Sequence, residues 1–134
     1  MKMAEKTILI ADDDMGMREL LAYLIKKILP DISIIQARNG KETADKLEEL
    51  SQADSLPDTV WTDFDMPVMN GLELLKFIRN HSDPRIKNLR VVMLTGSATR
   101  RLQIATEELN CRLLEKPMRL EDLRAIISSE LTKK

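Results

Sequence analysis

The chain has 134 residues, of which 43% are hydrophobic and 32% are charged, and its formal net charge is −1. This length suits one domain, and the balanced charge offers no basic surface of the kind that binds nucleic acid or an acidic membrane. No apolar run approaches the roughly 20 residues of a membrane span, and the single cysteine, Cys111, excludes an internal disulfide and fits a reducing cytoplasm.

Short β-branched runs alternate with segments whose apolar residues recur at helical spacing. In chain order the pattern predicts a strand over Thr7–Ala11, a helix over Met15–Leu29, a strand over Ile32–Ala37, a helix from the Asn39-Gly40 turn to about Leu50, a strand over Thr59–Thr62, a helix from Gly71, a strand over Arg90–Leu94, a helix over Ala98–Leu109, a strand over Arg112–Glu115 and a helix over Leu120–Leu131. The polar stretch His81–Asn88 is interpreted as a loop. Residues 1–134 then form one domain with a core of about 6–131 and short polar tails at both ends.

Strand and helix alternate five times, without an internal repeat or a low-complexity segment. Such alternation is typical of a parallel sheet, because right-handed crossovers place the connecting helices on both of its faces. We therefore predict an α/β fold with a single doubly wound five-stranded parallel sheet and helices on both faces.

Charged and hydroxyl side chains follow four of the predicted strands at the point where each strand ends. They are Asp12, Asp13 and Asp14 after the first strand, Asp63 after the third, Thr95 after the fourth and Lys116 after the fifth. Because the carboxyl ends of parallel strands meet at one edge of a sheet, we expect these side chains to converge. Clustered carboxylates raise one another's pKa, and a hard divalent cation relieves this repulsion. Mg²⁺ fits best, since it needs only one or two protein carboxylates and a phosphate oxygen.

The same residues indicate a reaction. The Lys116 ammonium can pair with a phosphoryl oxygen, and the Thr95 hydroxyl can donate one hydrogen bond to a newly placed oxygen. A carboxylate nucleophile, a metal ion and an ammonium together stabilise the charge of a transferring phosphoryl group. The sequence therefore predicts phosphoryl transfer onto Asp63.

Four segments, ILIADDD, PDTVWTDFDMPVMNG, VVMLTGS and EKP, resemble in order and separation the receiver domain of bacterial two-component response regulators. The resemblance covers essentially the whole chain and implies a flavodoxin-like, CheY-like fold with Asp63 as phospho-acceptor. It implies that Mg²⁺, for which Mn²⁺ could substitute, is held by Asp12, Asp13, Asp63 and the backbone carbonyl of Asp65. It also implies that Thr95 and Lys116 bind the phosphoryl group.

The resemblance implies partners as well. The phosphoryl donor is a sensor histidine kinase or a histidine phosphotransfer protein, and the output passes to a downstream protein effector. We expect no direct nucleic-acid binding and no membrane association, while a homodimer is compatible with the sequence. We expect a signalling phospho-acceptor rather than an enzyme, one that at most catalyses its own phosphorylation and dephosphorylation.

Several positions depart from the family pattern, among them Asp65, which adds a carboxylate beside the site and fits two effects, one on metal binding and one on dephosphorylation. Leu113 stands three residues before Lys116, where the family usually has an aromatic residue, Leu109 stands where glycine is common, and Gly96 stands where alanine is frequent. The aromatic residue normally rotates inward when the hydroxyl moves, so its absence predicts a different readout of phosphorylation.

Several other residues carry weaker signals. We interpret Asp14 as a solvated residue at a helix N-terminus, His81 as a solvated loop histidine and Cys111 as a small buried hydrophobe. Arg18 fits two interpretations, contact with an acidic neighbour or a place on the surface of its helix. The eight methionines are interpreted as core residues.

Three other functions fit parts of the sequence. A flavodoxin-like cofactor binder would need a glycine-rich phosphate loop after the first strand, where this chain has three aspartates. Asp63-Phe64-Asp65 is a DxD pattern like that of haloacid-dehalogenase-type phosphohydrolases, but there the pattern follows the first strand. A receiver-like interaction module that is not phosphorylated is the third alternative, and the complete set of acceptor-site residues argues against it.

Overall fold

Five parallel strands form one sheet in the order β2-β1-β3-β4-β5 in the computed structural model, which describes residues 6–131. In chain order the elements are β1 (Thr7–Ala11), α1 (Met15–Ile28), β2 (Ser33–Ala37), α2 (Gly40–Gln52), β3 (Thr59–Asp63), α3 (Gly71–Arg79), α4 (Pro84–Lys87), β4 (Arg90–Thr95), α5 (Arg100–Glu108), β5 (Arg112–Glu115) and α6 (Leu120–Leu131). The predicted polar tails lie largely at 1–5 and 132–134, outside the described residues.

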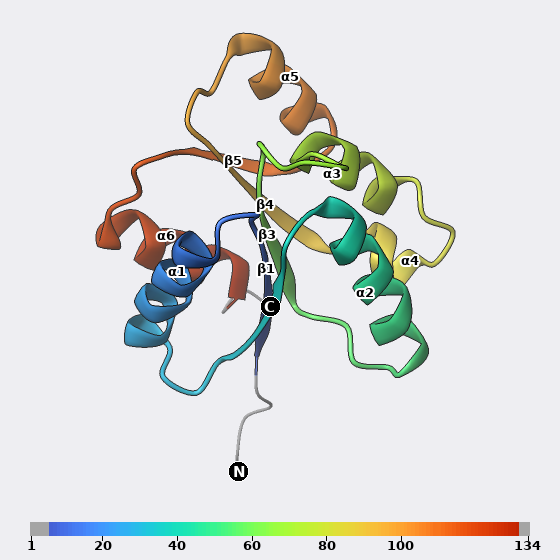
Figure 1. The fold of residues 1–134 in the computed structure, drawn as a ribbon, viewed down its shortest axis with the longest axis horizontal. Helices are drawn as coiled ribbons and strands as arrows, with labels where there is room; N and C mark the ends of the chain where they lie inside the picture. The colour runs from blue at the N-terminus through green and yellow to red at the C-terminus, as the bar shows by residue number, and fades with distance from the viewer. Residues whose placement is uncertain (1–5, 132–134) are drawn as a thin grey trace.

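The helices cover both faces of the sheet, as Figure 1 shows with α1 and α6 on one side and α2, α3 and α4 on the other. Two hydrophobic clusters correspond to these layers. One joins the sheet to α2, α3, α4 and α5, and the other joins it to α1 and α6. The predicted doubly wound fold is therefore confirmed. Within 6–131, no helix combines the length and apolar character that crossing a membrane requires.

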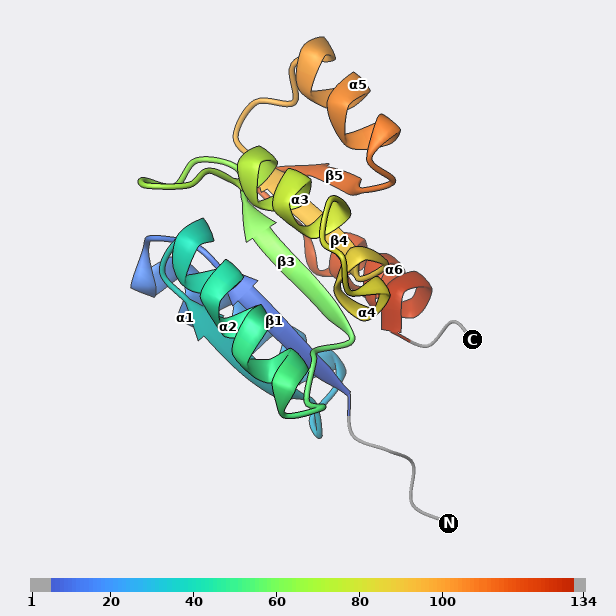
Figure 2. The ribbon, with the colours of Figure 1, turned by 90° about the vertical axis from the view of Figure 1, so that its right-hand side faces the viewer.

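Strand β3 lies at the centre of the sheet, between β1 and β4 (Figure 2). All five of its residues are buried, with Val60 in the cluster under α2 and α3 and Trp61 in the cluster under α1 and α6. A continuous apolar run of this kind suits a parallel strand that has helices on both faces. It carries Asp63, its last residue, to the carboxyl edge of the sheet.

The interpretation of His81–Asn88 as a loop without regular structure is wrong, because Pro84–Lys87 form the short helix α4. Asp83 caps this helix by accepting a hydrogen bond from the backbone N–H of Arg85 at 2.9 Å, and Pro84 occupies the first turn. Ile86 is fully buried in the core and holds the turn against the sheet. One helical turn is too short to produce the periodicity on which sequence analysis relies.

Other differences are local. Helix α5 begins at Arg100 rather than at Ala98, because Thr99 is its N-cap and accepts a hydrogen bond from the N–H of Leu102. His81 is not solvated, since its Nε2 lies 2.7 Å from Glu48 Oε1 and its Nδ1 accepts from the N–H of Asp83 at 2.9 Å. Not every methionine lies in the core, and the exposed ones among those described are Met15 and Met17.

The loop between β3 and α3 folds back onto the end of β3. Asn70 and Glu73 form a reciprocal capping box at the start of α3, with hydrogen bonds of 2.8 and 2.9 Å. The N–H of Gly71 donates to the carbonyl of Phe64 at 2.9 Å. A Cβ at Gly71 would lie 2.5 Å from the backbone oxygen of Asp63. Only glycine therefore permits this close approach.

We expect Gly71→Ala to lower the free energy of unfolding by about 1–3 kcal/mol, because the added methyl group forces apart backbone that is in close contact. Gly96→Ala is the matched control, since no atom lies within 4 Å of a Cβ at Gly96. Its effect should stay within about 0.5 kcal/mol. Urea denaturation of the two variants measures the difference, and equal stabilities would contradict the close packing at Gly71.

Candidate functional site

Three carboxylates and one ammonium meet at the carboxyl edge of the sheet. Asp12, Asp13 and Asp63 each offer a carboxylate oxygen, and these oxygens lie within 4.8 Å of one another. Nζ of Lys116 is 2.7 Å from Oδ1 of Asp63 and 4.0 Å from Oδ2 of Asp12. The residues come from the ends of β1, β3 and β5, so the structure places these four predicted site residues in one cluster.

The loop after β1 separates the three consecutive aspartates. The backbone N–H of Asp12 donates to the carbonyl of Ala37 in the neighbouring strand, and Oδ1 of Asp12 accepts from the N–H of Asp14 at 3.0 Å. Asp14 caps α1 by accepting from the N–H groups of Gly16 and Met17. Asp12 is buried and Asp13 is exposed. Asp14 thus belongs to the helix terminus, as predicted, while the two preceding aspartates belong to the cluster.

The surroundings of Asp12 and Asp63 destabilise the ionised form of both carboxyl groups. Burial raises the pKa of Asp63 above its ordinary value, although the hydrogen bond and charge of Lys116 oppose the rise. Burial also raises the pKa of Asp12, against the hydrogen bond from the N–H of Asp14, and the charge of Asp63 adds to the rise. Burial alone would lower the pKa of Lys116, but the hydrogen bond and charge of Asp63 outweigh it and raise that pKa. One ammonium therefore compensates the acids only in part.

This donor set fits a hard divalent cation. Such cations take oxygen ligands, and the carboxylates of Asp12, Asp13 and Asp63 supply three oxygens from two strand ends. A bound cation would offset the burial that mainly raises the pKa values of Asp12 and Asp63, and also the smaller repulsion between the carboxylates. Asp65 is exposed, and its charge is a smaller contribution to the raised pKa of Asp63, after burial. The role of its backbone carbonyl as a ligand stays a prediction.

Thr95 lies beside the cluster, but its hydroxyl makes its hydrogen bonds within the loop that follows β4. It is the last residue of β4 and is 2% exposed. Its hydroxyl donates to the carbonyl of Ser97 and accepts from the N–H of Ser97, both at 3.1 Å. Its own carbonyl accepts from the N–H of Lys116 at 2.8 Å. The backbone of Thr95 thus places Lys116, while its hydroxyl is engaged within the loop after β4.

Arg18 is a site residue that sequence analysis did not resolve. It is only 8% exposed, and its Nη1 donates to the backbone carbonyl of Asp12 at 2.6 Å. Its Nε donates to Oε1 of Gln36 at 3.0 Å. The arginine therefore contacts an acidic neighbour through the main chain rather than through a carboxylate. Its spacing in the sequence could have indicated its burial, because Arg18, Leu21 and Ile25 recur at helical spacing and share the buried face of α1.

Comparison with known proteins gives a consistent result. The family model described as "Response regulator receiver domain" matches residues 8–128. The chemotaxis protein CheY1 of Helicobacter pylori is 33% identical over 88 residues, which cover 66% of this chain and 65% of that protein. A protein-glutamate methylesterase/protein-glutamine glutaminase of Carboxydothermus hydrogenoformans is 38% identical over 98 residues, or 72% of this chain and 26% of that protein. The chain thus spans about a quarter of the methylesterase's length.

Solved structures share the fold. A two-component response regulator from Cytophaga hutchinsonii superposes with a TM-score of 0.85 at 25% identity, covering 98% of this chain and 100% of that one. A putative response regulator from Chloroflexus aurantiacus gives a TM-score of 0.80 at 27% identity, covering 97% and 100%.

We expect Asp12→Asn to raise the melting temperature at pH 7 when divalent cations are chelated. The folded chain holds the Asp12 proton more tightly than the unfolded chain, whose carboxyl titrates near 3.8. Ionisation of Asp12 therefore destabilises the fold as pH rises through the raised pKa, and the asparagine removes this loss while keeping an oxygen for the N–H of Asp14. Thermal unfolding should show the advantage shrink as pH falls towards 3.8. A variant less stable than the parent at pH 7 would show that the ionised Asp12 carboxylate does not destabilise the folded chain.

We expect Arg18→Ala to lower the free energy of unfolding by about 2 kcal/mol, because two hydrogen bonds from a buried charged group are lost. Arg124→Ala on the exposed side of α6 is the control, with an expected change within about 0.5 kcal/mol. Chemical denaturation measures both. If the two variants were equally mild, Arg18 would not hold the end of β1.

Proposed function

We propose that this chain, which belongs to the family of response regulator receiver domains, works as a phosphorylation-controlled switch in two-component signalling. The observation that carries the proposal is the contact at 2.7 Å between the buried Asp63 carboxylate and the Lys116 ammonium, inside the cluster with Asp12 and Asp13. A nucleophile with a cation beside it and further acids around it is the arrangement that phosphoryl transfer requires.

In the proposed reaction, an oxygen of the Asp63 carboxylate attacks the phosphorus of a phosphohistidine on a kinase or phosphotransfer protein. The new P–O bond forms as the P–N bond breaks, and the donor imidazole takes up a proton. Lys116 favours the ionised, nucleophilic form of Asp63 and then pairs with the transferred group. Mg²⁺, or Mn²⁺ in its place, held by Asp12, Asp13, Asp63 and the carbonyl of Asp65, would neutralise charge on the phosphoryl group.

The switch would act through the loop after β4. A phosphoryl oxygen on Asp63 offers the Thr95 hydroxyl a charged acceptor, which is stronger than the carbonyl of Ser97 that it contacts now. Taking this acceptor would break the two hydrogen bonds that the Thr95 hydroxyl makes with Ser97, and in the proposed switch the loop between β4 and α5 shifts as a result. Phosphorylation would therefore stabilise a shifted state. Helix α5 is suited to such a shift because few buried side chains hold it to the core, namely those of Leu102 and Thr106.

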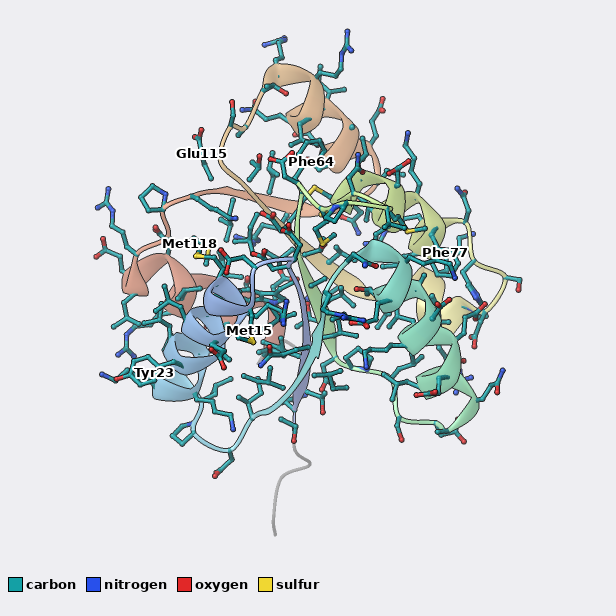
Figure 3. All side chains as sticks on the ribbon, in the orientation of Figure 1. Met15, Tyr23, Phe64, Phe77, Glu115 and Met118 are labelled. Carbon is teal, nitrogen blue, oxygen red and sulfur yellow. The ribbon has the colours of Figure 1, made fainter. Side chains whose placement is uncertain are left out.

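The donor would approach over α1. Met15, Leu20 and Tyr23 on this helix are 61%, 50% and 58% exposed, so the helix that begins beside the acceptor cluster carries several exposed apolar side chains. Figure 3 shows Met15 and Tyr23 on α1 and Met118 on the segment before α6. A groove of about 350 Å³ between these segments reaches Asp12 and Lys116. A helix of the donor that carries its histidine could dock here with the phosphoryl group facing Asp63.

We expect a small acyl phosphate such as acetyl phosphate, supplied with Mg²⁺, to add one phosphoryl group to the chain. Asp63→Asn and a chelator should each prevent the addition, because they remove the nucleophile and the cation. Intact-mass spectrometry before and after treatment measures the product. Asp65→Asn is the matched control and should still be labelled, since the proposed ligand of Asp65 is its backbone.

Two outcomes would contradict this proposal. An unchanged mass under saturating donor would leave a receiver-like module that is not phosphorylated. Multiple turnovers of a generic phosphate ester, abolished by both Asp63→Asn and Asp65→Asn, would instead indicate a phosphohydrolase that uses the DxD pattern.

A further inference from the structure

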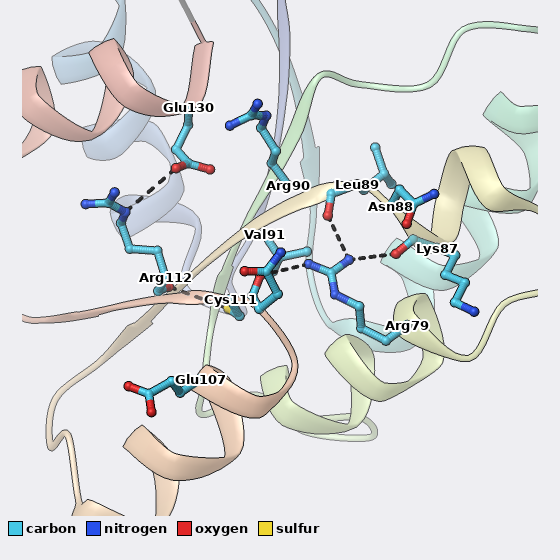
Figure 4. A pocket seen from close by; sticks show the side chains of 11 residues that line it. Arg79, Lys87, Asn88, Leu89, Arg90, Val91, Glu107, Cys111, Arg112 and Glu130 are labelled. Carbon is cyan, nitrogen blue, oxygen red and sulfur yellow. Dashed lines mark hydrogen bonds and ion pairs between the residues drawn. The ribbon is translucent and has the colours of Figure 1, made fainter. Parts of the chain in front are cut away.

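A second cavity lies at the opposite edge of the sheet from Asp63. It measures about 680 Å³ and is bordered by the first residues of β4 and β5 and by the ends of α3, α5 and α6 (Figure 4). This volume lies within the range of about 300–1,000 Å³ that small-molecule sites occupy. The acceptor cluster lies at the carboxyl ends of the strands, so the two sites share no residue.

The walls of this cavity, which we name the basic pocket, carry four cationic and two acidic side chains. They are Arg79, Lys87, Arg90 and Arg112, with Glu107 and Glu130. Over residues 6–131, Arg79, Lys87 and Arg90 have no carboxylate within ion-pair distance, and Arg112 approaches Glu130 only to 3.7 Å. The basic pocket therefore carries an excess of positive charge.

Arg79 supplies a positive charge that is already held in place. Its Nε and Nη atoms donate to the carbonyls of Leu109, Lys87, Leu89 and Asn110, at 2.7 to 3.1 Å. These acceptors are neutral, so they hold the guanidinium without cancelling its charge. Burial lowers the pKa of Arg79, as expected for a cation that is removed from water without a counter-ion. An anion beside it would supply the missing charge.

The other cationic groups are free to turn towards an anion beside Arg79. Arg90 makes one long hydrogen bond of 3.4 Å to the carbonyl of Ser129, so its side chain can turn towards a ligand at little cost. Lys87 is exposed on the rim. Figure 4 shows Glu130 turned to Arg112 and the carboxylate of Glu107 turned away from Arg79, so neither acid occupies the space beside that guanidinium. Leu89 and Val91 border the pocket but are only 7% and 2% exposed, so the ligand would meet mainly polar groups.

We infer that the basic pocket binds a phosphate dianion beside Arg79, either free or as part of a small phosphomonoester, with the side chains of Lys87 and Arg90 turning towards it. Arginine and lysine bind phosphate through charge-assisted hydrogen bonds, and a dianion matches the excess of cations in this pocket. The inference does not rest on phosphorylation of Asp63. It describes a separate site on the edge of the sheet where β4 and β5 begin.

Thermal shift and calorimetric titration with adenosine 5′-monophosphate test this inference, with Mg²⁺ chelated so that the acceptor cluster does not bind phosphate. The nucleotide should raise the melting temperature saturably, whereas adenosine, which lacks the charge, should not. The Lys87→Gln, Arg90→Gln double variant should bind about tenfold or more weakly, because it loses two charge-assisted contacts. Arg79 is left intact, since its four carbonyl contacts hold the fold.

Two controls accompany the titration. Lys76→Gln removes an exposed charge of α3 that does not line the basic pocket, and it should bind the nucleotide like the parent chain. Asp63→Asn should also bind like the parent, which separates this site from the acceptor. The inference is overturned by a flat titration, by adenosine binding as well as its monophosphate, or by equal weakening in Lys76→Gln. Titration with inorganic phosphate distinguishes the two sources: binding as tight as that of the nucleotide assigns the pocket to free phosphate, and weaker binding assigns it to a phosphomonoester.

Discussion

The structure depends on holding three like charges together at one edge of a sheet. Asp12, Asp13 and Asp63 repel one another, and burial raises the pKa of Asp12 and Asp63 despite the ammonium of Lys116. This arrangement lowers the stability of the folded chain in the absence of a cation. The packing of β1 and β3 against helices on both faces supplies the stability that keeps the acids in place. A bound cation would stabilise these carboxylates, and it would also stabilise a phosphoryl group on Asp63.

The surrounding backbone serves the same arrangement. Gly71 lets the loop after β3 lie against the carbonyl of Asp63, and Arg18 binds the carbonyl of Asp12. The carbonyl of Thr95 holds the backbone of Lys116, while the Thr95 hydroxyl stays with Ser97. Most of the acceptor site is therefore preorganised, and the loop after β4 is the part that a new phosphoryl oxygen would rearrange.

Periodicity and strand order were enough to predict the five strands, their parallel arrangement and the convergence of Asp63 with Lys116, because alternating apolar segments with polar ends encode all three. They could not predict α4, which is one turn long, or the contact of His81 with Glu48. They also could not place Val68 at a φ of 71°, a conformation that a β-branched residue rarely adopts. These features arise from tertiary contacts, and the charge excess of the basic pocket likewise emerges only when distant segments are folded together.

If these carboxylates gather to bind a divalent cation, a calorimetric titration with Mg²⁺ will detect it. We expect one saturable binding event for the parent chain and a large loss of affinity for Asp13→Asn, whose side chain is exposed and makes little contribution to the core. Absence of binding by the folded parent chain, or equal affinity in Asp13→Asn, would show that the three carboxylates do not form a cation site.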